Sequence, residues 1–410
     1  MGSRISRCFR SKQEENEQLI NLIVSNTSSP ESVSKKDQRS LLVFINPHSG
    51  RGKSLETFAH IVAPKLDSNS IRYEVVVTTG PNHARDVLIA KRDIGKFNGV
   101  LILSGDGLVF EALNGILSRE DAFGLLSNLP IGIVPSGSGN GLLCSVLAKH
   151  GLDLSEKSVM DRSIEIVTSP TANAERVPLY LVKTETETYA SFLSVGWGLM
   201  ADIDIESEKW RKLGKHRFDI MGFIRSCNLR CYKGRLTYRP YKARGYIPET
   251  NVFSVYDRTT QERIVEKNDS KLTPKTWRLH DPTDVKCLDA EEEEVVIQDD
   301  FINMYAVTLS HIAANHPYAP SAQLEDNRIH LSYILWRDIR TRVDVARYLL
   351  AIEQGKHLDL PFVKNVEVSS MKLEVLSEGS YVVLDGEVIE TKSIEFSSTR
   401  NNFCVFSSTS

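Results

Sequence analysis

The sequence predicts two domains: an α/β domain whose parallel sheet lies between two layers of helices, followed by a β-rich antiparallel sandwich. Between residues 41 and 151, short apolar runs alternate with stretches whose apolar residues recur at helical spacing, as they do in successive βα units. After about residue 170, strand-like stretches rich in β-branched and aromatic residues follow one another with little helix between them. The length of 410 residues also exceeds that of one ordinary compact domain.

The elements of the first half are expected in a regular order. Strands are predicted at residues 41–45, 73–78, 99–103 and 131–134, and each precedes a helical stretch. The first helix is expected to end at Pro64, because proline lacks the amide hydrogen that a helix interior requires. The fourth is expected to end at Gly151, since glycine tolerates the left-handed backbone of a helix end. Four βα units in succession imply a parallel sheet with helices on both faces.

The second half is expected to consist mainly of strands. These are predicted at residues 189–195, 301–309, 329–335, 371–376 and 381–384, with helices at 205–213 and 343–354. Residues 242–300 are polar and contain proline, so we expect a mobile surface insertion there. The predicted organisation is a disordered tail and linker at 1–40, one domain at 41–170 and a second at 171–405.

Composition excludes several classes of protein. Fifty basic and fifty-three acidic residues give a formal charge of −3, which disfavours a dedicated nucleic-acid binder. The six cysteines lack paired CxxC spacing, so neither a zinc site nor a disulfide framework is indicated, and a reducing, cytoplasmic compartment is expected. No apolar run approaches the roughly 18 to 20 residues that span a bilayer.

The N-terminus carries a pattern typical of N-myristoylation, with Gly2 as the acceptor. One acyl chain anchors a protein only weakly, so a palmitoylated Cys8, or Arg4, Arg7 and Arg10 against anionic lipid, would supply the second signal. This predicts a peripheral membrane protein. The alternative is an unmodified tail, since the pattern is short.

Three loops follow predicted strands, at the position where open α/β sheets bind ligands. The first, residues 46–54, nearly matches a P-loop, but Pro47 stands where the first glycine is required. Arg51 and Lys53 precede a helix N-terminus, which suits an anion. A flexible basic turn is the alternative.

The second loop is Ser104-Gly105-Asp106-Gly107. The two glycines allow close approach of a ligand and leave the Asp106 carboxylate unshielded, which favours a catalytic carboxylate over the simple turn that an Asp-Gly pair usually forms. Glu111, one helical turn further on, is expected to face the same cleft.

The third loop, residues 135–141, alternates glycines with small polar residues and predicts a nest of amide donors for phosphate. It is not the dehydrogenase fingerprint, and the strand at 73–78 ends without an acidic ribose ligand. Together the loops indicate phosphoryl transfer, but the residues alone distinguish no further than a kinase or another nucleotide-binding enzyme.

In order and spacing these loops resemble the diacylglycerol-kinase-type catalytic domain of lipid kinases, whose hallmark is a GGDG-like motif, here Ser104 to Gly107. The serine variant, the Asn82-His83-Ala84-Arg85 stretch and the block at residues 196–214 are similar to the sphingosine kinases. The resemblance extends from residue 41 to about residue 403, except for the insertion.

The resemblance implies an ATP-binding domain, a lipid-binding domain and a cleft between them, with ATP and Mg²⁺ as cofactors. The positions that match nucleotide contacts are Asn46, Pro47, His48, Thr78, Thr79, Gly80, Pro81, Asn82, Glu111, Gly137, Ser138, Gly139, Arg211, Arg217, Asp385, Gly386 and Glu387. The sphingoid base is expected at Ser104, Gly105, Asp106, Gly107 and Asp204, and Glu387 is the candidate metal ligand. Asp106 would accept the proton of the lipid's primary hydroxyl.

Substrate choice depends on Asp204, whose carboxylate would bind the ammonium that diacylglycerol and ceramide lack. Alternatively Asp204 pairs locally on its helix, and the enzyme is a ceramide or diacylglycerol kinase. A further alternative is an NAD kinase, but it would leave the N-terminal lipidation pattern unexplained. The alternative that is not an enzyme is a membrane-tethered scaffold that binds nucleotide without catalysis. Trp197 and Trp210 are expected at a membrane interface. The sequence leaves open the oligomeric state, a homodimer included, and the preferred chain length of the lipid.

Overall fold

The structure is a computed structural model, and it describes residues 19–21, 38–50, 52–137, 139–214, 216–241, 246–247, 252–257, 262–266 and 294–408. The residues with predicted roles that lie outside these ranges are Gly2, Arg4, Arg7, Cys8, Arg10, Arg51 and Ser138, and the side chain of Arg211 is not described.

The first half is the predicted α/β unit, with a parallel sheet ordered β4-β3-β1-β2. Its strands are β1 (Ser40–Ile45), β2 (Arg72–Val77), β3 (Gly99–Ser104) and β4 (Ile131–Pro135). Every residue of β3 and β4 is buried, so helices cover both faces of the sheet, which explains the continuous apolar runs in the sequence. The connecting helices include α4 (His83–Ala90), α5 (Asp106–Leu117), α6 (Ala122–Asn128), α7 (Gly141–Lys149) and α8 (Glu156–Thr168).

The predicted end of the first helix at Pro64 is wrong. The helix continues as α2 (Ser54–Thr57), a π-helical stretch η1 (Phe58–Val62) and α3 (Ala63–Ser68). Pro64 lies in the first turn of α3, where a helix tolerates proline because the amide there lacks an α-helical partner. The wider π turn has already interrupted the regular α-helical hydrogen bonds, so the missing amide hydrogen of Pro64 costs the helix little.

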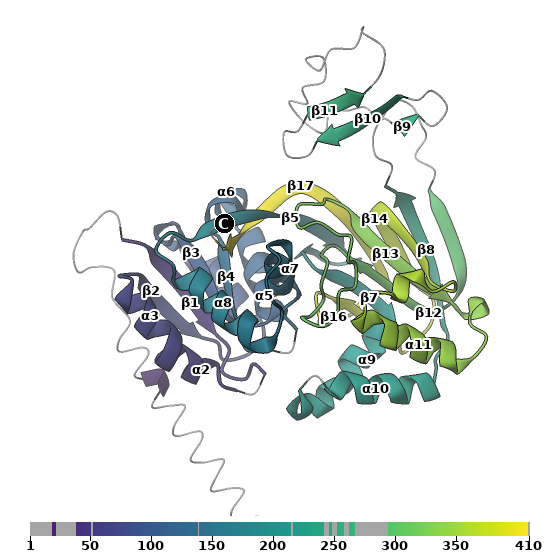
Figure 1. Ribbon diagram of the computed structural model, residues 1–410, viewed down its shortest axis with the longest axis horizontal. Helices are drawn as coiled ribbons and strands as arrows, with labels where there is room; N and C mark the ends of the chain where they lie inside the picture. Colours follow the sequence, from purple (N-terminus) through teal and green to yellow (C-terminus); the bar gives the residue numbers. More distant parts are fainter. Residues whose placement is uncertain are drawn as a thin grey trace, which may run out of the picture.

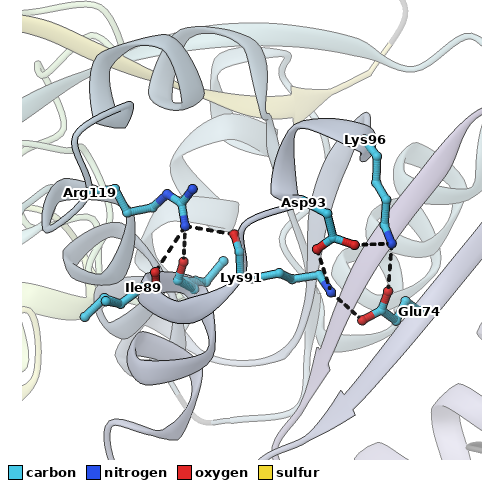
Figure 2. Close-up of polar contacts among 7 residues, drawn as sticks. Glu74, Ile89, Lys91, Asp93, Lys96 and Arg119 are labelled. Carbon is cyan, nitrogen blue, oxygen red and sulfur yellow. Dashed lines mark hydrogen bonds and ion pairs between the residues drawn. The ribbon is translucent and has the colours of Figure 1, made fainter.

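Arg119, just beyond α5, holds the C-terminal end of α4. Beyond the end of α5, the guanidinium of Arg119 donates hydrogen bonds to three carbonyl oxygens at the C-terminus of α4, those of Leu88, Ile89 and Lys91, at 2.7, 3.3 and 2.9 Å (Figure 2). Beside it is an ion-pair cluster formed by Glu74 of β2, Lys91 and Asp93 of the segment after α4, and Lys96 of η2 (Ile94–Lys96). This fixes the position of α4 on the sheet.

The second half contains the predicted antiparallel strands, so the expected fold class is confirmed. They include β6 (Thr188–Ser191), β7 (Ser194–Gly198), β8 (Tyr232–Pro240), β12 (Val295–Val307), β13 (Ile329–Leu335), β14 (Lys364–Val375), β15 (Val382–Leu384) and β16 (Glu387–Ile389). Strand β8 pairs with both β12 and β14, and β13 pairs with the same two strands, so the sheet curls on itself.

A single 14-stranded sheet runs through both halves. Strand β17 (Ser393–Ser407) pairs antiparallel with β14 and β5 (Asn173–Lys183), and its Val405 lies opposite Ile131 of β4 in parallel register. Figure 1 shows β5 and β17 arching from one half to the other. Neither strand is predicted from the sequence. Together they connect the second half to the parallel sheet of the first half.

The predicted insertion at 242–300 ends earlier than expected, because β12 already begins at Val295, opposite Tyr238 of β8. Exposure alternates along Val295 to Gln298, as in a strand with one buried face, so these residues belong to the sheet and not to the expected insertion. Within the insertion, β9 (Tyr246–Ile247), β10 (Val252–Asp257) and β11 (Glu262–Glu266) form a separate antiparallel sheet.

Helices beside the curled sheet enclose a second hydrophobic core. They are α9 (Leu199–Ser207), η3 (Glu208–Leu213), α10 (His216–Cys227), η5 (Trp336–Asp338), α11 (Arg342–Glu353) and η6 (His357–Asp359). Leu199, Met221 and Tyr348 pack together there, one from each of the three long helices. Helix α9 begins earlier than predicted, because Gly198 adopts a φ of 90° and turns the chain directly from β7 into the helix.

Candidate active site

The three loops that were predicted to lie together do so at the carboxyl ends of β1, β3 and β4. The Ser104 hydroxyl donates to that of Ser49 at 3.3 Å, and the Ser136 amide donates to the Ser104 carbonyl at 2.9 Å. Gly50 approaches the third loop so closely that a Cβ there would lie 1.7 Å from the Ser136 carbonyl oxygen. A Cβ on Gly105 would lie 2.7 Å from the carbonyl oxygen of the third loop's Gly139. Two of the glycines are therefore required for the loops to converge.

Asp106 is the first residue of α5 and is 7% exposed. Its carboxylate accepts hydrogen bonds from the Gly141 amide at 2.6 Å and the Leu142 amide at 3.3 Å, both at the N-terminus of α7. Burial raises the pKa of Asp106 to about 7, and the charge of Asp385 adds to this rise, whereas the two amides oppose it. The result is a buried carboxyl group that titrates near neutral pH.

Asp385 and Gly386 form the tight turn between β15 and β16, with φ angles of 49° and 91°, as expected of an Asp-Gly hairpin. The buried Asp385 carboxylate accepts hydrogen bonds from the Ser191 hydroxyl and from the amides of the next three residues, at 2.8 to 3.0 Å. Burial raises its pKa to about 6. These bonds split the predicted strand at 189–195 into β6 and β7, since the amides turn toward Asp385.

The same turn places Glu387 beside the N-terminus of α5. A Cβ on Gly107 would lie 2.6 Å from Glu387 Oε1, so this acidic side chain of the second half lies against the residue that follows Asp106. The structure thus brings the acidic turn and the second loop together.

The loop at residues 78–82 is anchored by its neighbours. The Thr78 amide donates to the Ile45 carbonyl at 2.9 Å, and Asn82, with a φ of 63°, precedes α4. The Glu111 carboxylate accepts a hydrogen bond from the Ala84 amide at 3.2 Å, and burial raises its pKa. Glu111 therefore holds this loop from α5, while Thr79, Gly80, Pro81 and Asn82 are exposed.

The first loop is partly exposed. Asn46 Oδ1 accepts a hydrogen bond from the His48 amide at 2.9 Å, and the Asn46 carbonyl accepts one from the Ser54 hydroxyl. Pro47 is partly buried, and His48 and Lys53 are exposed beside it. Gly137 and Gly139 of the third loop are likewise partly accessible, so the backbone of both loops can be approached.

Asp204 and Arg217 lie in the second half, on α9 and α10. Arg217 Nη2 lies 3.8 Å from Asp204 Oδ1, and Nη1 pairs with Glu208. Arg217 is buried, whereas the Asp204 side chain is 34% exposed. Tyr305 links this pair to the acidic turn, because the charges of Asp204 and Asp385 both add to the rise that burial causes in its pKa. Tyr305 was not predicted as a site residue, because no local sequence pattern distinguishes it.

A second residue that the sequence analysis missed is Asp202, which is completely buried. Its Oδ2 accepts hydrogen bonds from the Tyr232 hydroxyl at 2.6 Å and from Arg230 at 3.0 Å, and lies 3.4 Å from Arg225 Nη2. Burial raises the pKa of Asp202, while the arginines oppose the rise. The alternation of acidic residues from 202 to 208, ahead of arginines at helical spacing, was the available sequence signal.

The expectation that Trp197 rests at a membrane interface is wrong. Trp197 is completely buried, and its ring packs edge-on against Tyr232 and Phe301 at centroid distances of 5.7 and 5.6 Å. Its indole nitrogen donates to the Ser380 hydroxyl, which satisfies its one polar group. Among the described residues, no helix combines the length and apolar character needed to cross a bilayer.

Within the described ranges, no three His, Cys, Asp or Glu side chains gather as a metal site. The exposed Glu387 carboxylate is an oxygen donor of the kind that Mg²⁺ prefers. Such a donor set fits an ion that arrives with nucleotide phosphates and takes one or two ligands from the protein.

Comparison with known proteins identifies relatives over most of the chain. Residues 40–170 match the family described as the diacylglycerol kinase catalytic domain. The chain is 69% identical over 388 residues to sphingosine kinase 1 of Caenorhabditis elegans, covering 90% of this chain and 81% of that protein. It is 31% identical over 363 residues to sphingosine kinase 1 of Mus musculus, covering 87% of each.

Among solved structures, a diacylglycerol kinase from Bacillus anthracis str. Sterne superposes with a TM-score of 0.53 at 12% identity, covering 92% of this chain and 98% of that one. At that identity the likeness shows a shared fold.

Proposed function

The chain belongs to the family of sphingosine kinases and is thus a lipid kinase that phosphorylates sphingosine, and we propose that Asp106 is the general base of this reaction. The observation that carries the proposal is the buried carboxyl group at the start of α5, whose pKa is about 7. A general base is most effective when its pKa lies near the working pH. Asp106 would accept the proton of the primary hydroxyl as that oxygen attacks the γ-phosphorus of ATP.

The phosphates of ATP are proposed to lie over the first and third loops. Support comes from the accessible backbone of Gly137 and Gly139 and from the exposed Lys53 of the first loop. Asn46, Pro47, His48 and the exposed loop at 78–82 would contact the rest of the nucleotide, with Glu111 holding that loop in place. By resemblance Arg211 and Arg217 would add positive charge, which stabilises the transferring phosphoryl group.

Mg²⁺ would be held by Glu387 together with the nucleotide phosphates. When bound, the ion would neutralise charge on the phosphates and orient the transferring group. Asp385 would not itself be a ligand in this scheme, because its two oxygens already accept four hydrogen bonds that fix the turn.

The ammonium of the sphingoid base is proposed to bind Asp204. Two features support this assignment: about a third of the Asp204 side chain is exposed, and its ion pair with Arg217 is long, at 3.8 Å. A carboxylate favours a cationic partner, whereas the acylated nitrogen of ceramide and the hydroxyl-bearing diacylglycerol offer no charge.

A cytoplasmic location and a peripheral encounter with anionic membrane are proposed for this enzyme. Helix α10 carries Ile220, Phe223 and Ile224 on one side, with exposures of 40%, 71% and 40%. Apolar side chains gathered in this way suit insertion into a lipid surface. Phe223→Asp should weaken binding to phosphatidylserine vesicles, whereas Phe123→Asp, at the exposed Phe123 of α6, should not. Equal binding by all three proteins would exclude α10 as the contact, and Gly2→Ala tests the tail separately.

The test of the function supplies Mg²⁺, labelled ATP and, separately, sphingosine, ceramide, diacylglycerol and NAD to the wild-type chain and to Asp106→Asn. Label should enter sphingosine alone, and only with the wild type. Label in ceramide or diacylglycerol would keep the kinase but remove the role of Asp204. ATP binding without turnover by the wild type would indicate a scaffold, and substantial turnover by Asp106→Asn would remove Asp106 as the base.

A further inference from the structure

We propose that Ser145 is a positioning residue, which keeps the N-terminus of α7 against Asp106 by binding the backbone of His311 from the second half. The inference rests on the proposed function, because it takes Asp106 as the base. It concerns a residue that touches neither substrate and that no motif in the sequence distinguishes.

The contact between Asp106 and α7 depends on two backbone amides. Gly141 and Leu142 donate to the Asp106 carboxylate, and Ser145 lies one helical turn further along the same helix. Ser145 is 3% exposed. Any displacement of this first turn would therefore carry both amides away from the carboxylate.

Ser145 binds His311 through its backbone. The Ser145 hydroxyl accepts a hydrogen bond from the His311 amide at 3.1 Å and lies 3.4 Å from the His311 carbonyl oxygen, to which it donates. A hydroxyl that serves as acceptor and donor to one residue defines both the distance and the rotation of that residue relative to α7. The His311 ring is engaged elsewhere, with the Ser310 hydroxyl at 2.9 Å from Nδ1.

The segment that carries His311 is itself tied to the acidic turn. Thr308 donates its amide to the Leu193 carbonyl at 3.0 Å and its hydroxyl to the Phe192 carbonyl. The amides of these same two residues donate to Asp385. Hydrogen bonds and short stretches of backbone thus connect the turn at Asp385, through Thr308 and His311, to Ser145 and the amides on Asp106.

Close packing at Gly141 shows that the approach of the two halves is tight here. A Cβ on Gly141 would lie 2.7 Å from the His311 carbonyl oxygen and 2.8 Å from Leu193 Cδ1. Because even one methyl group has no room, the amide of Gly141 is set directly by the backbone of the second half. Ser145 then holds the two surfaces in register.

Loss of the Ser145 hydroxyl should therefore weaken the hydrogen bonds that the Gly141 and Leu142 amides donate to the Asp106 carboxylate. The other ionisable groups around Asp106 are Asp385 and Glu387 of the acidic turn, Cys144 on α7, and His311, whose pKa burial lowers. None of them is altered by the substitution. A change in the titration of Asp106 would thus report on the amides, which favour its ionised form.

The test compares Ser145→Ala with Ser163→Ala in the full chain. Ser163 is a matched control, since it is equally buried, lies on α8 and donates to the Met160 carbonyl at 2.8 Å. We expect Ser145→Ala to lower kcat roughly tenfold, with KM for ATP and sphingosine unchanged, and to shift the acid limb of the kcat profile upward by roughly half a pH unit. Ser163→Ala should change thermal stability alone.

Gly141→Ala should produce the same shift more strongly, because its methyl group would push the His311 carbonyl away. Profiles of Ser145→Ala and Ser163→Ala that coincide with the wild type would overturn the positioning role. If Asp106→Asn keeps its activity, Asp106 is not the general base, and the proposed function fails together with this inference. A failure of the positioning role alone would leave Asp106→Asn inactive and the Ser145→Ala profile unshifted.

Discussion

Asp204 and Arg217, which the sequence analysis assigned to two different ligands, form an ion pair with each other, with 3.8 Å between Asp204 Oδ1 and Arg217 Nη2. Glu208 is the second partner of the same guanidinium. The residue expected to bind the lipid ammonium therefore touches a residue expected to bind nucleotide phosphate. Because Arg217 retains Glu208 when Asp204 changes, the two roles can be separated by mutation.

Asp204→Asn should raise KM for sphingosine at least roughly tenfold and alter KM for ATP far less, because an amide no longer attracts the ammonium. Steady-state kinetics with each substrate varied in turn measure this. Asp219→Asn is the control, since Asp219 is an exposed carboxylate on the facing helix α10. Equal increases in both Michaelis constants would argue against recognition of the amine.

The rate should depend on pH through Asp106. Burial raises its pKa to about 7, and a base must be ionised to act, so kcat should rise with pH and level off above neutrality. A profile measured from roughly pH 5.5 to 9 at saturating substrates tests this. A rate that stays constant across neutrality would show that the group with this pKa is not in the rate-limiting step.

Asp106→Asn should stabilise the fold at alkaline pH. The pKa of Asp106 is higher in the folded chain than the ordinary value of 3.8, so the folded state binds the proton more tightly and loses stability as pH rises from about 4 to about 7. Removing the charge should recover up to about 4 kcal/mol at pH 8, and little at pH 4. Thermal denaturation of both proteins at the two pH values provides the comparison. A variant that is less stable than the wild type at pH 8 would contradict it.

Arg225, which is buried, should contribute more to the free energy of unfolding than Arg230, which is partly exposed. Arg225→Ala leaves the completely buried Asp202 with a weaker set of partners and should cost about 3–5 kcal/mol. Arg230, whose side chain is 43% exposed, contacts the same carboxylate, and its removal should cost about 1 kcal/mol. Urea unfolding distinguishes the two, and equal losses would mean that burial is not the deciding factor.

Arg119 should stabilise the fold more than the ion-pair cluster beside it (Figure 2). Arg119→Ala removes hydrogen bonds to two part-buried carbonyls at the end of α4 and should cost about 1–3 kcal/mol. Lys96→Ala breaks accessible ion pairs with Glu74 and Asp93 and should cost less than about 1 kcal/mol. Denaturant midpoints of the two variants test the order, and the reverse order would refute it.

Much of the first half was predictable from local pattern. Strands β1, β3 and β4 are buried on both faces, so each is a continuous apolar run that periodicity detects easily. The convergence of their loops followed from the general rule that carboxyl ends of parallel strands share one edge. The Asp385-Gly386 hairpin was equally predictable, because few residue pairs accept two positive φ angles in succession.

The strands that join the two halves were not predictable in this way. β17 pairs with β5 and β4, which lie far away in the sequence, and the polar stretch at residues 397–402 interrupts its apolar residues, so no continuous strand pattern is visible. Helix α10 was missed because its buried face includes Arg217 and Arg225, whose charges are tolerated there by acidic partners on α9 and η3. Charged residues on a buried face cancel the periodicity on which such predictions rely.

Local sequence was therefore sufficient for the type of fold, the position of the loops and the family of the protein, since each depends on residues close together in the chain. Only the folded molecule reveals that Asp106 is buried beneath the α7 amides, that Asp385 is bound by four donors, and that Ser145 contacts His311. These properties depend on desolvation and on contacts between distant segments, and neither exists before the two halves pack together.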